Sequence, residues 1–214
     1  VLLLFSCGKK EEQVKAEKNK LEVLCSFSIL EDWLKEIGGD KISVTSLVGA
    51  EEDRHHYSAK PRDMKQVEEA DLIYCVGIGF DKWLDKLHEA SSQEAEIHFL
   101  AAGLEGLRQV KIQHGDHFHN HADPHVWHDL VQVQKMIQRI ADSLSEKDAA
   151  NATYYQANAK SYIAELKVLE EWTKTDQCIY SHHSEPNKWI FSDVPRRRYY
   201  LAGDVCHRRD ATCC

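Results

Sequence analysis

The sequence lacks several features that would each identify a class of protein. No apolar run is long enough to span a membrane, no Cys-x-x-Cys pair is present, and no His-Glu-x-x-His helix motif of zinc peptidases occurs. Positive charge is also in deficit, with 27 Lys and Arg residues against 35 Asp and Glu residues and a formal net charge of -8. This balance argues against nucleic acid and against an anionic membrane surface as partners.

Enough hydrophobic residues are present, 43% of 214, to build a real core. The seven cysteines do not form a scaffold or a four-cysteine zinc site, because no pair has the required spacing. Cys25 and Cys75 each lie inside an apolar run. We therefore expect these two thiols to be small buried residues.

The first twenty residues resemble the end of a bacterial lipoprotein signal followed by a tether. Leu4-Phe-Ser-Cys7 matches the tetrad that precedes a lipid-modified cysteine, and the chain opens on Val1 without a basic leader. We expect residues 1–20 to be a clipped signal and a polar tether, with Cys7 as the lipid-bearing residue.

Apolar strand-like runs alternate with helical patterns through the first two thirds of the chain. This alternation predicts an α/β fold with a parallel sheet, in a lobe that covers residues 21–147. A second helical pattern then runs from Asp148 to about residue 175, with one apolar face, and predicts a long backbone helix. The expected strands are 21–27, 42–48, 71–77 and 97–101, and the expected helices are 29–37, 61–70 and 81–90.

Histidine is concentrated in one stretch. Six of the 13 histidines lie between His114 and Asp129, and neutral imidazole is a common ligand of divalent transition metals. The part from His114 to His121 has no apolar periodicity, which predicts a mobile loop with weak metal-binding histidines at His117, His119 and His121. Asp123-Pro124 then predicts a helix N-cap, with His125 in the first helical turn as a metal ligand and His128 as a weaker candidate.

A second group of histidines follows the second expected strand, where His55 and His56 lie in a polar loop. In parallel sheets, ligands bind at the carboxyl ends of the strands. This loop and the histidine-rich stretch should both open at that edge. We therefore predict one metal site built from His55 and His125, about seventy positions apart.

Four motifs resemble those of the metal-specific substrate-binding proteins of bacterial zinc and manganese ABC importers. The motifs are Ser26-Phe-Ser-Ile-Leu, Glu52-Asp-Arg-His55-His-Tyr, Gly77-Ile-Gly-Phe-Asp-Lys-Trp-Leu and Asp123-Pro-His125-Val-Trp. The resemblance implies two α/β lobes joined by a rigid helix, metal held between them, and first ligands at His55 and His125. A histidine-rich loop in that family goes with zinc rather than manganese. One departure is Arg54, where the family usually has Pro.

The resemblance fades after about residue 175. Residues 176–214 have little amphipathic period, and their composition changes abruptly, as a reading-frame shift followed by an early stop would produce. We expect the second lobe to be missing or replaced by this irregular tail. Two histidines are fewer than the three or four ligands of a stable site, which predicts weaker and less selective metal binding.

The leading expectation is a monomeric zinc receptor, a periplasmic or cell-surface lipoprotein of a bacterium that delivers metal to an ABC permease in the inner membrane without chemistry. One alternative is a zinc hydrolase with Glu52 as general base. A second alternative is a histidine-rich metal buffer without a permease. The last is a truncated product without function.

Overall fold

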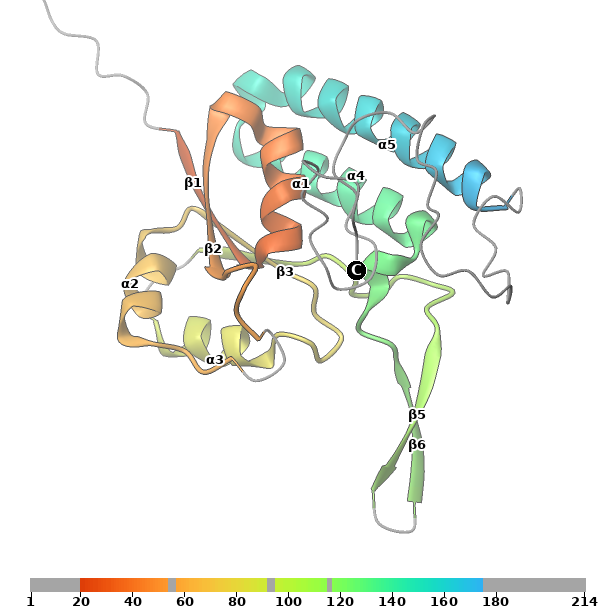
Figure 1. Cartoon of the computed structure of the whole chain (residues 1–214). Coiled ribbons are helices and arrows are strands. Elements are labelled where there is room, and N and C mark those ends of the chain that lie inside the picture. The colour runs from red at the N-terminus through yellow and green to blue at the C-terminus, as the bar shows by residue number, and fades with distance from the viewer. Residues whose placement is uncertain (1–19, 54–56, 92–94, 115–116, 175–214) are drawn as a thin grey trace, which may run out of the picture.

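The computed structural model describes residues 20–53, 57–91, 95–114 and 117–174 (Figure 1). The expected lipidation at Cys7 and the tail of residues 176–214 lie outside this range and stay predictions. Within it, no helix is long and apolar enough to cross a membrane.

A four-stranded sheet forms the centre of the domain. Its strands are ordered β2-β1-β3-β4 and all pair in parallel. The strands are β1 (Leu21–Phe27), β2 (Ile42–Val48), β3 (Leu72–Cys75) and β4 (Glu96–Phe99). All four expected strands are therefore confirmed, as is the α/β class.

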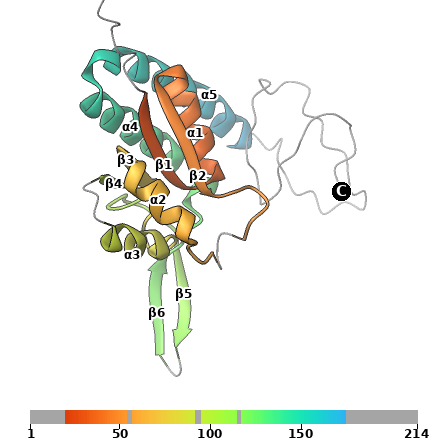
Figure 2. The same ribbon diagram turned by 90° about the vertical axis from the view of Figure 1, so that its left-hand side faces the viewer.

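Helices cover both faces of the sheet because successive residues of a buried strand point to opposite sides. Figure 2 shows α1, α4 and α5 on one side and α2 and α3 on the other. The helices are α1 (Ser28–Gly38), α2 (Pro61–Glu69), α3 (Lys82–Ala90), α4 (Leu130–Lys147) and α5 (Ala152–Lys174), with short 3-10 turns η1 (Gly39–Lys41), η2 (Val126–His128) and η3 (Ala149–Asn151). Cys25 and Cys75 are buried in the sheet, as expected.

The long helix α5 packs against α1 and α4. Its 23 residues give a length of about 34 Å at the usual rise per residue. The apolar face that its sequence pattern predicts is buried: Tyr155, Ala159, Tyr162, Leu166 and Leu169. The prediction of a long helix after the α/β lobe is confirmed.

The histidine-rich stretch is not the loop that its composition predicted. Residues Gln109–His114 (β5) and His117–Ala122 (β6) pair as an antiparallel hairpin, which projects from the domain in Figures 1 and 2. The sequence signal that was overlooked is a histidine at every second position from His117 to His121, which is the period of a strand. Gly115-Asp116 between the two runs is a pair typical of hairpin turns.

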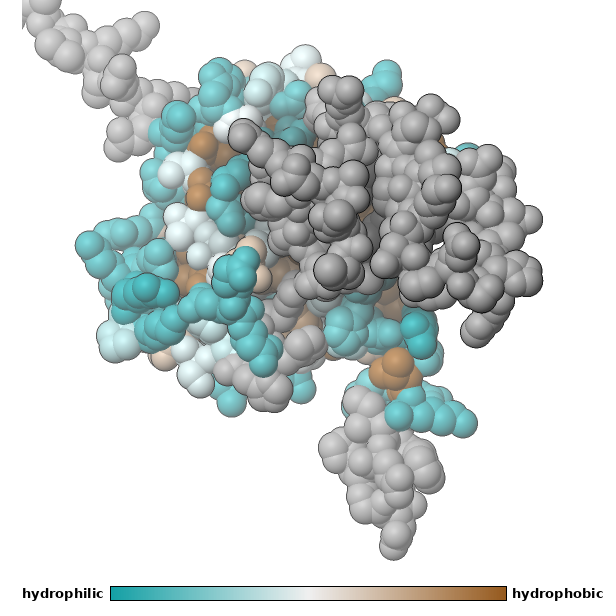
Figure 3. All heavy atoms as spheres, in the orientation of Figure 1, coloured by the Kyte–Doolittle hydropathy of each residue, from teal (hydrophilic) through white to brown (hydrophobic). Residues whose placement is uncertain are grey.

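The surface seen in Figure 3 is mainly hydrophilic over the described residues, with a small hydrophobic area where the hairpin leaves the domain. The apolar side chains are collected instead in two clusters, one on each side of the sheet. A buried hydrogen bond of 2.7 Å between the hydroxyls of Tyr74 and Ser143 ties β3 to α4. The sheet and α4 thus form one packed unit on the α1 side.

A tight turn follows β3. Gly77, Ile78 and Gly79 have φ angles of 78°, 46° and 93°, so three consecutive residues are left-handed. A Cβ atom on Gly77 would also lie 3.1 Å from the Cβ atom of Phe99. The position therefore needs glycine for its backbone angle and for its close approach to β4.

Replacing Gly77 with alanine should lower the free energy of unfolding by about 1–2 kcal/mol, because the left-handed region is costly for a residue with a Cβ atom. Urea denaturation of the variant would measure this loss. Gly49→Ala is the matched control, since its added Cβ would meet only the Glu52 carboxylate, at 3.9 Å. Equal stability of both variants would contradict the assignment of strain to this turn.

Candidate metal centre

His125 lies at the carboxyl edge of the sheet, between the end of the hairpin and the 3-10 turn η2. Its imidazole packs edge-on against two aromatic rings, with centroid distances of 5.3 Å to Trp127 and 6.5 Å to Phe80. Those two rings also pack on Phe27, at the end of β1, at 5.1 and 5.2 Å. His125 thus lies at the edge of the sheet where it was expected, and its role as a metal ligand stays a prediction.

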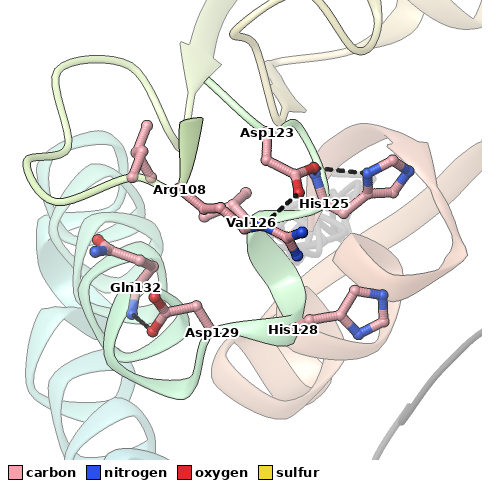
Figure 4. Close-up of a pocket in the computed structure, with 8 residues that line it drawn as sticks. Arg108, Asp123, His125, Val126, His128, Asp129 and Gln132 are labelled. Atoms are coloured by element: carbon pink, nitrogen blue, oxygen red, sulfur yellow. Dashed lines mark hydrogen bonds and ion pairs between the residues drawn. The ribbon is translucent and has the colours of Figure 1, made fainter. Parts of the chain in front are cut away.

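The Asp123 carboxylate holds His125 through two hydrogen bonds. Its Oδ1 atom accepts from the backbone N–H of His125 at 3.0 Å and lies 2.8 Å from the ring Nδ1 (Figure 4). Desolvation tends to raise the pKa of Asp123, but these bonds outweigh it and hold the pKa below its ordinary value. An ionised carboxylate can only accept, so Nδ1 carries the proton of this hydrogen bond, and Nε2 would be the ligand atom of the neutral ring in a metal site.

The helix cap predicted at Asp123 is wrong. Asp123 binds His125 instead, and the cap of α4 is Asp129, whose Oδ1 accepts from the backbone N–H groups of Val131 and Gln132 at 2.9 and 3.2 Å. His125 accordingly precedes a 3-10 turn and does not lie in the first turn of an α-helix. The two aspartates therefore have separate tasks, one at the imidazole and one at the helix.

Asp129→Ala should destabilise the domain by about 1 kcal/mol, the usual cost of removing an N-cap. The effect should appear as a lower denaturation midpoint with unchanged binding of metal at His125. Asp123→Ala should show the reverse, a weaker metal site with little loss of stability. If Asp123→Ala were the more destabilising change, the assignment of the caps would be wrong.

A cavity of about 390 Å³ opens beside this turn. Figure 4 shows the imidazoles of His125 and His128 projecting to the same side of η2. Arg108 also lines the cavity, with its Nε atom 3.8 Å from Asp123, and its positive charge would repel a cation on that side. Among the described residues no group of three or more His, Cys, Asp and Glu side chains could hold a metal ion.

The loop that carries His55 is fastened at both ends. Near its start, the Glu52 carboxylate accepts from the backbone N–H of Gly49 at 3.2 Å and from Lys60 at 2.8 Å. Near its end, Tyr57 donates to the buried Asp63 at 2.7 Å and packs on Trp83 at 4.7 Å between ring centroids. His55 itself lies outside the described residues, so its pairing with His125 stays a prediction.

Glu52 is poorly suited to act as the general base of a hydrolase. The hydrogen bond from Lys60 and the backbone bond from Gly49 lower the pKa of its carboxyl below the ordinary value. A general base works best with a pKa near the operating pH, which requires a shift in the opposite direction. The hydrogen bonds of Glu52 stabilise the conformation of the loop.

The hairpin register gives the backbone partners of its four histidines. His114 pairs with His117, Ile112 pairs with His119, and Val110 pairs with His121. His121, the member nearest the domain, is exposed.

The comparisons with known proteins agree with this fold. Residues 23–191 match the ZnuA family, described as the periplasmic component A of the zinc-uptake complex. The chain belongs to this family. The resemblance inferred from the four motifs is therefore confirmed at the level of the family.

Curated relatives carry metal-binding names. The manganese-binding lipoprotein MntA of Halalkalibacterium halodurans is 34% identical over 171 residues, which cover 80% of this chain and 54% of the relative. The manganese ABC transporter substrate-binding lipoprotein ScaA of Streptococcus gordonii is 33% identical over 201 residues, which cover 92% of this chain and 63% of the relative. The chain thus spans a little over half the length of such relatives.

Solved structures of the same kind share the fold. The crystal structure of ZnuA superimposes with a TM-score of 0.61 at 29% identity, over 72% of this chain and 57% of that one. The manganese-bound periplasmic metal-binding protein of Candidatus Liberibacter asiaticus gives 0.59 at 29% identity, over 68% and 53%. Both metals therefore occur among the names of the relatives, so the expected choice of zinc is left open.

Proposed function

We propose that this chain captures a divalent transition-metal ion outside the cytoplasm and presents it to an ABC-type permease. The observation that carries the proposal is the geometry of His125, whose Nδ1 atom is held by Asp123 at the carboxyl edge of a parallel sheet. Metal-binding histidines are usually held in this way by a carboxylate or a carbonyl group. The family consists of solute-binding components, so no turnover is expected.

His55 is the proposed second ligand. It is separated by one residue from Tyr57, which packs on Trp83 of α3. The turn that leads into α3 in turn carries Phe80, one of the two rings that contact His125. Tyr57 and His125 thus both contact the short segment of residues 80–83, through Trp83 and Phe80.

Zinc is the proposed metal, in preference to manganese. Imidazole nitrogen suits zinc, whereas manganese favours carboxylate and carbonyl oxygen. The carboxylate of Asp123, beside His125, is already bound to the His125 backbone and ring. The relatives named for manganese make this a choice that direct competition between the two metals must decide.

The proposed cellular setting follows that of the relatives, which are named as lipoproteins of metal ABC transporters. We infer a bacterial lipoprotein at the periplasmic or cell-surface side of the membrane, with Cys7 as the lipid-bearing residue. The proposed partner is the membrane permease of such a transporter. The net charge of -8 suits a protein that attracts cations.

Single substitutions of the proposed ligands test the site. His125→Ala and His55→Ala should each weaken zinc binding by at least about 100-fold, and Asp123→Asn should weaken it by about 10-fold, as loss of an outer-shell partner does. Zinc titration against a competing chelator gives these affinities. Repeating the titration with manganese should show much weaker binding with the same dependence on both histidines.

His88→Ala is the matched control, because the Nε2 atom of His88 bonds the carbonyl of Ala95 outside the site. It should bind zinc like the unaltered protein. A variant lacking His55 that retained full affinity would show that the two histidines do not share one ion. Manganese binding as tight as zinc binding would overturn the proposed choice of metal.

Metal buffering by the hairpin is the second candidate function, because four of the residues in its two strands are histidines, and three of them alternate along β6. Four imidazoles in so short a segment would offer several pairs of nitrogen ligands without a fixed geometry. Binding there should be weaker than at His125 and should involve more than one ion. The hairpin would then increase the number of metal ions that the chain binds, while the tight site is at His125.

Replacing His117, His119 and His121 together with asparagine should lower the number of zinc ions bound and leave the tightest one in place, because the His125 site is intact. Calorimetric titration would resolve the two classes of site. Lys111→Gln with Asn120→Ser is the control, since these two residues of the hairpin pair with each other and neither is a histidine. Loss of all tight binding in the triple variant would make the hairpin the main metal site.

A further inference from the structure

The left-handed turn at residues 77–79 leads into Phe80, which contacts His125, and the turn is strained. Gly77 and Gly79 accept a positive φ without cost, but Ile78 has φ 46° and a β-branched side chain, for which this region is an outlier. Strain of this kind persists only where the surrounding structure imposes it, and it is common at ligand-binding sites.

The turn is held by the carboxylate of Asp81, a residue only 1% exposed. Its Oδ2 atom accepts from the backbone N–H of Val76 at 2.7 Å, and its Oδ1 atom accepts from that of Gly77 at 2.9 Å. The side chain of Asp81 makes no hydrogen bond to cap α3, at whose start it lies. The carboxylate thus satisfies two buried amides at the end of β3.

Phe80 is what the turn presents to the site. The backbone N–H of Phe80 donates to the carbonyl of Gly77 at 3.0 Å, which closes the turn. The Phe80 ring then lies 5.0 Å from Trp127 and meets the His125 imidazole edge-on at 6.5 Å. The direction of the imidazole is therefore fixed by Asp123 on its Nδ1 side and by the rings of Phe80 and Trp127 beside it.

We propose that Asp81 is a positioning residue for metal capture: its buried carboxylate holds the strained turn that places Phe80 against His125, and so keeps the imidazole aimed at the ion. The inference rests on the proposed function of His125. Asp81 thus contributes to the metal affinity although its side chain does not bond to His125. Phe80 transmits this effect from the end of β3 to the imidazole.

Asp81→Asn is the direct test in the whole chain. The side-chain amide of asparagine has a single acceptor oxygen, so one of the two backbone N–H groups would face an NH2 group. Zinc affinity, measured against a competing chelator, should fall by about 10-fold, the lower end of the range for outer-shell groups. Asp85→Asn is the matched control, because it makes the same change of charge and its buried Oδ1 atom accepts no hydrogen bond from the described residues; it should bind zinc normally.

A double-mutant cycle separates positioning from general destabilisation. In a His125→Ala background, Asp81→Asn should change zinc affinity by less than about 2-fold, because its effect passes through the missing imidazole. Histidine-labelled NMR of the metal-free protein should also show one narrow His125 ring signal that broadens in Asp81→Asn and stays narrow in Asp85→Asn. A purely structural role would lower the melting temperature and leave that signal narrow.

Phe80→Leu provides the test if Asp81→Asn does not fold, because it removes the ring and leaves the turn in place. It should reproduce the 10-fold loss of zinc affinity. Unchanged affinity in Phe80→Leu and in a folded Asp81→Asn, with loss in His125→Ala, would overturn this inference alone. Unchanged affinity in His125→Ala would overturn the proposed site and this inference together.

Discussion

The packing of three aromatic rings at the carboxyl edge of the sheet is the contact on which the candidate site depends. Phe27 ends β1, Phe80 follows the turn after β3, and Trp127 lies in the 3-10 turn before α4, and their centroids are 5.0–5.2 Å apart. Tilted aromatic pairs at this separation contribute about 0.5–1.5 kcal/mol each beyond the burial of their area. These contacts join three segments that are distant in the sequence, at the place where His125 lies.

The parts of the fold that the sequence predicted are those in which burial alone decides the structure. The spacing of apolar residues predicts the strands that begin at Leu21 and Ile42 and the buried face of α5. Apolar side chains must recur on the side of each element that faces the core. The observed order of strands and helices along the chain also agrees with the predicted order. The expectation that His125 lies at the carboxyl edge followed from the parallel order of the strands.

The two errors arose where polar groups decide the structure. Asp123-Pro124 and Asp129-Leu130 are both plausible helix starts by residue type, and only the competition of His125 for the first carboxylate separates them. In the hairpin, polar residues on both strands hide the alternation on which strand prediction depends. Hydrogen-bond choices of this kind are decided by neighbours in space, which a local pattern does not contain.

One oxygen of Asp123 accepts both the backbone N–H and the ring of the same residue, His125, and this closes a small loop of atoms. The imidazole consequently gives up its rotational freedom during folding, before any ion arrives. Ordering a free side chain at the moment of binding would cost about 0.5–1.5 kcal/mol. A ligand ordered in advance lets an ion enter and leave without a rearrangement of its own side chain, a property that would suit the proposed delivery of metal.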